Sequence, residues 1–135
     1  MASKVIKHLS AQEIIEFNIL SIDLIKSKKA DKSEILSYQK IREIVSGCEE
    51  LDADIYGKAA YILKSIIKKH AFASGNRRTA FIATKHFVLT NGGEFRITDE
   101  PEYAKIMTGI RENYYTDDEI INWIKDGSIR KFERR

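Results

Sequence analysis

Hydrophobic residues recur every three to four positions along most of the chain, and this spacing is the period of an α-helix. A single Pro and seven Gly interrupt the pattern at only a few places. The pattern therefore predicts an all-α fold in which amphipathic helices pack as a compact bundle. A chain of 135 residues can bury roughly 68% of its unfolded surface, so we expect residues 1–135 to form one domain.

Capping residues mark the first two predicted helices. Ser10 and Glu13 form a capping-box pattern, which predicts a helix over residues 11–26. Ser33 is the candidate cap of a second helix, and Gly47 is its predicted end.

The rest of the pattern predicts further helices and one irregular segment. Acidic residues before position 55 favour a helix N-terminus there. Alternation of polar and apolar residues over 94–97 predicts either a brief strand or a linker. The further helices are predicted over 55–69, from Gly75 or Asn76 to about 89, from 99–101 to about 112, and after Thr116, which forms a capping box with Glu119.

Composition limits the class of protein. Cys48 is the only cysteine, which excludes an intramolecular disulfide framework and a cysteine-based zinc cluster and indicates a reducing, cytoplasmic compartment. The net charge of +3 is too small to indicate a nucleic-acid-binding protein. No segment resembles a signal peptide or a membrane span, so we expect no membrane partner.

The segment HAFASGNRRTA, residues 70–80, contains the candidate chemistry. Gly75 permits a tight turn, and the backbone amides that follow lie at a helix N-terminus, where they favour a bound anion. Arg77 and Arg78 in the first turn oppose the helix dipole by roughly 0.3 to 1 kcal/mol each, so helix stability does not explain them. Their bidentate geometry suits phosphate oxygens. His70 could take a proton from an incoming hydroxyl group. A base beside a phosphate-binding turn indicates a group-transfer reaction.

The same segment resembles the signature of the Fic and Doc (death-on-curing) family, commonly written HxFx[D/E/N][G/A]N[G/K]R. The matching residues, in register, are His70, Phe72, Gly75, Asn76 and Arg78. The residues that favour the Doc branch over typical Fic proteins are Arg77, Thr79, Ala80 and Phe81, the last of which stands where typical Fic proteins carry another arginine.

The resemblance implies a compact all-helical fold with the signature loop between two central helices. It also implies the use of ATP and a toxin that a separate antitoxin protein neutralises. Doc members phosphorylate a threonine of a translation elongation factor, whereas Fic members usually attach AMP to a hydroxyl group. The expected function is therefore a Doc-like transfer of a phosphoryl group from ATP to a Ser or Thr hydroxyl of a protein.

The resemblance also implies roles for single residues. His70 matches the general base and Phe72 the anchor of the loop. The positions that hold the phosphates of the nucleotide are matched by Gly75, Asn76, Arg77 and Arg78. Ser74 occupies the slot of the acidic residue that binds Mg²⁺ in active members. Because Mg²⁺ prefers carboxylate and phosphate oxygens, Ser74 places the use of Mg²⁺ in doubt.

Three alternatives remain open from the sequence. The chain could transfer AMP instead of a phosphoryl group, or it could be a non-catalytic module that binds a nucleotide or a partner. Arg77 and Arg78 could also form a basic patch for nucleic acid with neighbouring lysines, which are Lys64, Lys68, Lys69 and Lys85. Nucleic acid is the weakest of these hypotheses, because no set of aromatic residues interleaves the charges.

Overall fold

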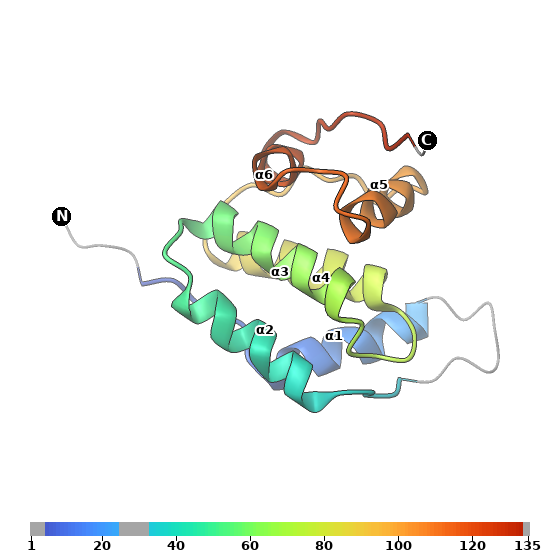
Figure 1. Cartoon of the computed structure of the whole chain (residues 1–135). Helices are drawn as coiled ribbons and strands as arrows, with labels where there is room; N and C mark the ends of the chain where they lie inside the picture. Colours follow the sequence, from blue (N-terminus) through green and yellow to red (C-terminus); the bar gives the residue numbers. More distant parts are fainter. Residues whose placement is uncertain (1–4, 25–32, 134–135) are drawn as a thin grey trace.

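The computed structural model describes residues 5–24 and 33–133, which form six α-helices (Figure 1). The all-α fold expected from the sequence is confirmed for these residues. The helices are α1 (Ala11–Leu24), α2 (Tyr38–Glu50), α3 (Ile55–Lys69), α4 (Asn76–Thr90), α5 (Glu102–Arg111) and α6 (Asp117–Asp126).

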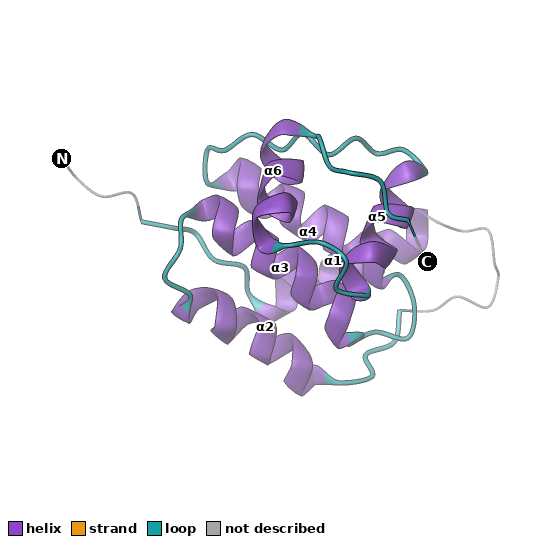
Figure 2. Ribbon diagram, turned by 45° about the horizontal axis from the view of Figure 1, so that its top comes forward, coloured by secondary structure: helices purple, strands orange, loops and turns teal. Residues whose placement is uncertain are grey.

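Helices α3 and α4 lie in the middle of the bundle (Figure 1). Helices α1 and α2 lie on one side of this pair, and α5 and α6 lie on the other. Figure 2, in a second view, shows only helices and loops among the described residues. Ala59, Leu63, Ala80 and Phe87 are buried completely between the layers.

Three of the predicted helix starts are confirmed by their capping hydrogen bonds. The backbone N–H of Glu13 donates to Ser10 Oγ over 3.1 Å, and Thr116 forms a complete capping box with Glu119. Asp54 caps α3 by accepting from the backbone N–H of Gly57 over 2.9 Å. The predicted end of the first helix, at residue 26, lies outside the described residues.

The predicted start of the second helix at Ser33 is wrong. Helix α2 begins at Tyr38 and is capped by Ser37. The residues before it pair with the loop after α3 instead: the backbone N–H of Leu36 donates to the carbonyl of Ala71 over 2.8 Å. This extended pairing removes residues 34–36 from any helix, which their local sequence could not indicate.

The predicted helix end at Gly47 is also wrong, because α2 continues to Glu50. A Cβ atom at Gly47 would overlap the hydroxyl group of Tyr61 on α3. The glycine therefore permits close packing of α2 against α3 and does not end the helix.

The segment at 94–97 is a linker rather than a strand. Its backbone is held by a bond from the N–H of Arg96 to the carbonyl of Ile124, over 2.8 Å, and by one from the N–H of Glu94 to Tyr56 Oη, over 2.9 Å. Helix α5 begins at Glu102, after Pro101, so Asp99 lies outside the helix that it was expected to open. No helix of the described ranges is long and apolar enough to cross a membrane.

Candidate active site

The loop between α3 and α4 reverses the chain in six residues, from His70 to Gly75. His70 is the C-cap of α3 and has the left-handed conformation, with φ 50° and ψ 52°. Phe72 follows and is 1% exposed, and its backbone forms a bridge with Ile35. Phe72 therefore fixes the loop to the core.

Asn76, the first residue of α4, ties the two ends of this loop together. Its Oδ1 accepts from the backbone N–H of Phe72 over 3.2 Å, and its Nδ2 donates to the carbonyl of Phe72 over 2.8 Å. These two bonds fix the orientation of the amide, so Nδ2 also faces His70 Nδ1, at 3.3 Å. A donor at this nitrogen favours the tautomer with its proton on Nε2, which leaves Nδ1 as the hydrogen-bond acceptor.

A buried polar network on α1 holds the loop between α3 and α4. Asn18 and Ser21 are both 0% exposed. Asn18 Nδ2 donates to the backbone carbonyl of Ser74 over 2.9 Å and to Thr79 Oγ1 over 3.1 Å. Ser33 Oγ donates to Asn18 Oδ1 over 2.7 Å, and Ser21 Oγ lies 3.2 Å from Thr79 Oγ1. The amide of Asn18 is therefore fully used in holding the loop and α4 against α1.

Asn18 and Ser21 were not predicted from the sequence to support the site. The signal that could have indicated them is their spacing from Ile14, because positions 14, 18 and 21 lie on one face of α1. Two polar residues on the buried face of an amphipathic helix require polar partners inside the fold. Their partners on the loop and on α4, however, are 56 to 61 residues away along the chain.

Gly75 occupies a position that favours glycine for two reasons. Its φ is +76°, in the left-handed region, and a Cβ atom there would lie 2.8 Å from Ser21 Oγ. Close approach of this residue to α1 places the amides that follow at the N-terminus of α4, beside the pocket described next.

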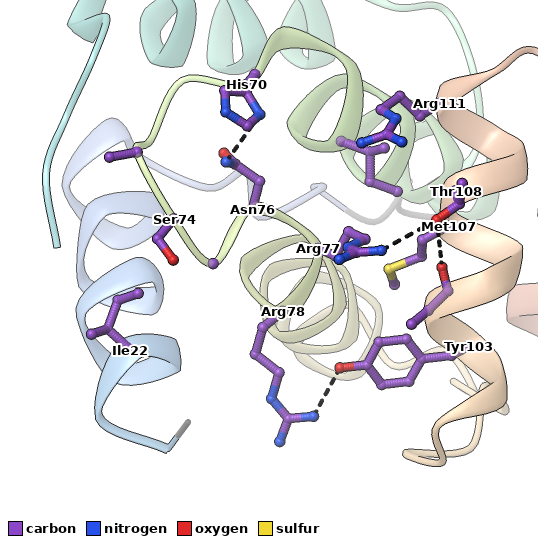
Figure 3. Close-up of a pocket in the computed structure, with 14 residues that line it drawn as sticks. Ile22, His70, Ser74, Asn76, Arg77, Arg78, Tyr103, Met107, Thr108 and Arg111 are labelled. Carbon is purple, nitrogen blue, oxygen red and sulfur yellow. Dashed lines mark hydrogen bonds between the residues drawn. The ribbon is translucent and has the colours of Figure 1, made fainter. Parts of the chain in front are cut away.

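A cavity of about 370 Å³ opens beside the loop, between α4 and α5 (Figure 3). This volume lies within the range of sites for small ligands, roughly 300 to 1,000 Å³. Of the residues expected to form the site, only Phe72 stays outside the wall, beneath the loop. The structure brings the others together in the wall: His70, Ser74, Gly75, Asn76, Arg77 and Arg78. Helix α5 closes the opposite side with Tyr103, Ala104, Met107, Thr108 and Arg111.

Arg78 is held by two partners that its local sequence does not indicate. Its Nη1 donates to Asp99 Oδ1 over 2.5 Å and to Tyr103 Oη over 3.1 Å. The hydrogen bond to Asp99 raises the pKa of the Arg78 guanidinium above its usual value. Tyr103 is in turn stacked on Phe81, with 4.9 Å between the ring centroids. The charge of Arg78 is thus partly neutralised, and its position is fixed from α5.

Arg77 points across the pocket toward α5 (Figure 3). Its Nη1 donates to Thr108 Oγ1 over 3.2 Å, and the Thr108 hydroxyl donates to the carbonyl of Ala104 over 3.0 Å. A neutral hydroxyl leaves the charge of Arg77 uncompensated. Arg111, one helical turn after Thr108, adds a further positive charge to the same wall.

The lysines that the sequence placed near these arginines do not belong to this wall. Three of them, Lys64, Lys68 and Lys69, line a separate cavity between α3 and α6. There Lys64 pairs with Asp117 at 3.1 Å and Lys69 with Glu43 at 3.7 Å. The positive charge of the pocket beside the loop therefore comes from arginines.

The wall of this pocket does not fit a magnesium ion held by the protein. Among the described residues that line it, none is Asp or Glu, and Ser74 supplies only a hydroxyl group. The nearest acid that the contacts identify, Asp99, is already bonded to Arg78. No group of three or more potential ligands from His, Cys, Asp and Glu occurs in the described parts of the chain. Mg²⁺ requires oxygen ligands of which one or two are usually carboxylates.

Comparison with known protein families agrees with this geometry. The model of the Fic/DOC family matches residues 8–88, which is more than half of the chain and extends from α1 through most of α4. No curated protein matches the chain. The matched region contains the loop, the network of Asn18 and both arginines of α4. The chain therefore belongs to the Fic/DOC family, whose members modify proteins by transfer of AMP or a phosphoryl group.

Proposed function

We propose that the protein transfers a phosphoryl group from ATP to a hydroxyl group of another protein, as the Doc branch of the family does. One observation carries the proposal: the loop places His70 and the two arginines Arg77 and Arg78 around one cavity. A base and a phosphate-binding group that share one pocket are the two parts that this transfer needs.

In the proposed step, Nδ1 of His70 accepts the proton of the substrate hydroxyl. The hydroxyl oxygen then forms a bond to the γ-phosphorus, the bond from that phosphorus to the bridging oxygen breaks, and ADP leaves with the electron pair. The incoming hydroxyl replaces the 3.3 Å contact between Asn76 and His70, and Asn76 keeps its two bonds to Phe72. A base of this kind contributes roughly 10² to 10⁴ to the rate.

The phosphates of ATP face the positive side of the pocket. The free amides at the start of α4 and the guanidinium of Arg77 meet the charge that develops on the phosphoryl oxygens. The amides are held in place by the start of α4 and the guanidinium by Thr108 of α5, so these groups need little reorganisation during the reaction.

Two residues favour the Doc-like reaction over transfer of AMP. Arg77 is closer to the lysine of Doc proteins at this position than to the glycine of Fic proteins. Phe81 stands where typical Fic proteins carry another arginine, so α4 supplies no third arginine there. Its ring is 4% exposed and stacks on Tyr103. By the same likeness, we propose a hydroxyl of a translation elongation factor as the target and a separate antitoxin protein as the inhibitor.

Ser74 favours a second candidate function, a non-catalytic module that binds a nucleotide or a partner. Its hydroxyl replaces the acidic residue of active members, and the pocket wall offers no other carboxylate among the described residues. Under this second function, Ser74→Asp should create transfer activity that the natural chain lacks. If the natural chain already transfers phosphate, this candidate is excluded.

The test is transfer of radiolabel from ATP to the proteins of a host lysate, with γ-labelled and α-labelled ATP in parallel. His70→Asn is the informative variant, because asparagine also tolerates the left-handed conformation at this position. His86→Asn on the exposed face of α4 is the matched control. We expect γ-label on a protein band with the natural chain and with His86→Asn, and a loss of at least about 100-fold with His70→Asn. Label from α-labelled ATP alone would establish transfer of AMP instead.

A further inference from the structure

We propose that the pocket holds the polyphosphate tail of its nucleotide directly between arginines of two facing helices, and that Arg111 of α5 supplies a charge which elsewhere in such a site would come from a metal ion. The inference deepens the proposed function, because it names how that site takes its substrate.

The wall of the pocket carries several positive charges. Arg77, Arg78 and Arg111 line it, and the described lining residues include no carboxylate. Asp99 neutralises Arg78 from behind, over 2.5 Å. Arg77 donates to a neutral hydroxyl, and no ion pair to Arg111 occurs among the described contacts. Two positive charges in the wall therefore have no acidic partner in the part of the chain that the structure describes.

Arg111 lines the pocket from the end of α5. It is the last residue of α5, and its side chain lies on the same side of the pocket as Thr108, which binds Arg77 (Figure 3). Arg77 and Arg111 therefore approach the cavity from α4 and α5, one on each side. Guanidinium groups in this arrangement can each give two parallel hydrogen bonds to phosphate oxygens.

The wall of the pocket lacks the carboxylate oxygens that would hold a divalent metal ion. A polyphosphate brings several negative charges, which a site must neutralise with cations. The hydroxyl of Ser74 brings no negative charge with which to bind a divalent ion together with the phosphates, as a carboxylate would. Two unpaired arginines can instead contact the phosphate oxygens directly. Mg²⁺ bound to the phosphates in solution would then compete with the arginines for the same oxygens. We expect the pocket to prefer the metal-free polyphosphate.

The direct probe is inorganic tripolyphosphate, measured by calorimetric titration in EDTA and again with excess Mg²⁺. The variants are Arg111→Gln and Arg111→Lys, with Arg42→Gln on the exposed face of α2 as the matched control. We expect binding in EDTA, weaker binding with Mg²⁺, and an affinity about tenfold lower for Arg111→Gln. Arg111→Lys should lie between the two, because it keeps the charge and loses the planar fork. The control should bind as the natural chain does.

Two results would overturn the inference: binding of tripolyphosphate that requires Mg²⁺, or equal affinities of the natural chain and Arg111→Gln in EDTA. Failure to bind tripolyphosphate at all would overturn it as well. The proposed function fails by a different result, which is the absence of transferred label. A chain that binds tripolyphosphate through Arg111 without transferring label would support the inference and contradict the enzyme.

Discussion

Asn18 on α1 donates from Nδ2 to the backbone carbonyl of Ser74, over 2.9 Å, so the first helix holds the loop from which the pocket is built. The bond joins two residues 56 positions apart. The same nitrogen also donates to Thr79 on α4, over 3.1 Å. The loop is thus positioned by the core of the bundle as well as by its own turn residues.

Replacement of Asn18 by Ala should destabilise the fold and loosen the loop. The change removes the donor to the half-buried carbonyl of Ser74 and to the fully buried hydroxyl of Thr79. Each unsatisfied buried group costs about 1 to 3 kcal/mol, so we expect the free energy of unfolding in urea to fall by at least about 2 kcal/mol. Glu16→Ala, at an exposed position of the same helix, should change it by less than about 0.5 kcal/mol. Equal stability of the two variants would contradict the role of the network.

Replacement of Gly75 by Ala should cost both stability and binding. At φ +76° an alanine is strained by roughly 1 to 2 kcal/mol, and its Cβ atom would also press on Ser21 Oγ at 2.8 Å. The control is Gly92→Ala, since Gly92 has a φ of +80° but lies after α4, away from the pocket. Thermal unfolding should show a loss for both variants, and titration with ATP should show weaker binding only for Gly75→Ala. A binding loss shared by both would indicate general destabilisation instead.

Helix caps explain why most of the fold could be predicted from the sequence. Ser10, Asp54 and Thr116 act on backbone groups within three residues, so the local sequence is sufficient to identify them. Helix α2 was misplaced because both of its ends depend on distant contacts. Residues before it pair with Ala71, and Gly47 is required by Tyr61 of α3. Neither contact has a local signal.

The candidate site divides in the same way. The loop residues were identified because they form one continuous segment with a recognisable spacing. Asp99, Tyr103 and Arg111 were not, because they lie on α5 and the linker before it, 21 or more residues after Arg78. Only the fold shows that Tyr103 and Arg111 line the cavity and that Asp99 is bonded to Arg78. They alter the interpretation of the motif, since Asp99 occupies one of the two arginines expected to hold phosphate.

Removal of the charge of Asp99 should strengthen the binding of polyphosphate. In Asp99→Asn the side-chain oxygen can still accept from Arg78, while the negative charge beside the pocket is lost. We expect the affinity for ATP to rise about two- to fivefold at low salt, and the gain to shrink as salt screens the charges. Tyr103→Phe, which removes the other contact to Arg78 without a change of charge, should not raise the affinity. Weaker binding by Asp99→Asn would show that Asp99 serves to position Arg78 and that its charge is secondary.

The pair of Glu119 and Arg130 should make the stability of the fold depend on pH in the acidic range. The hydrogen bond from Arg130, and next the backbone N–H of Thr116, lower the pKa of Glu119 from 4.5 to about 2. Because the pKa of the folded state lies below that of the unfolded state, the stabilisation is present above about pH 4.5 and is lost as the pH falls toward 2. The pair is near the surface, so solvent screening limits the effect to about 1 kcal/mol.

Glu119→Gln isolates this contribution, because glutamine can still accept the capping bond from the backbone of Thr116 and lacks only the charge. Urea unfolding at pH 7 should show the variant to be less stable than the natural chain by about 1 kcal/mol, and at pH 2.5 the difference should largely disappear. Glu102→Gln is the control, since its carboxylate is exposed and lies 4.0 Å from Lys105. It should follow the natural chain at both pH values. A difference between Glu119→Gln and the natural chain that is the same at pH 7 and pH 2.5 would mean that the variant acts through packing, and that the ion pair with Arg130 contributes nothing to folding.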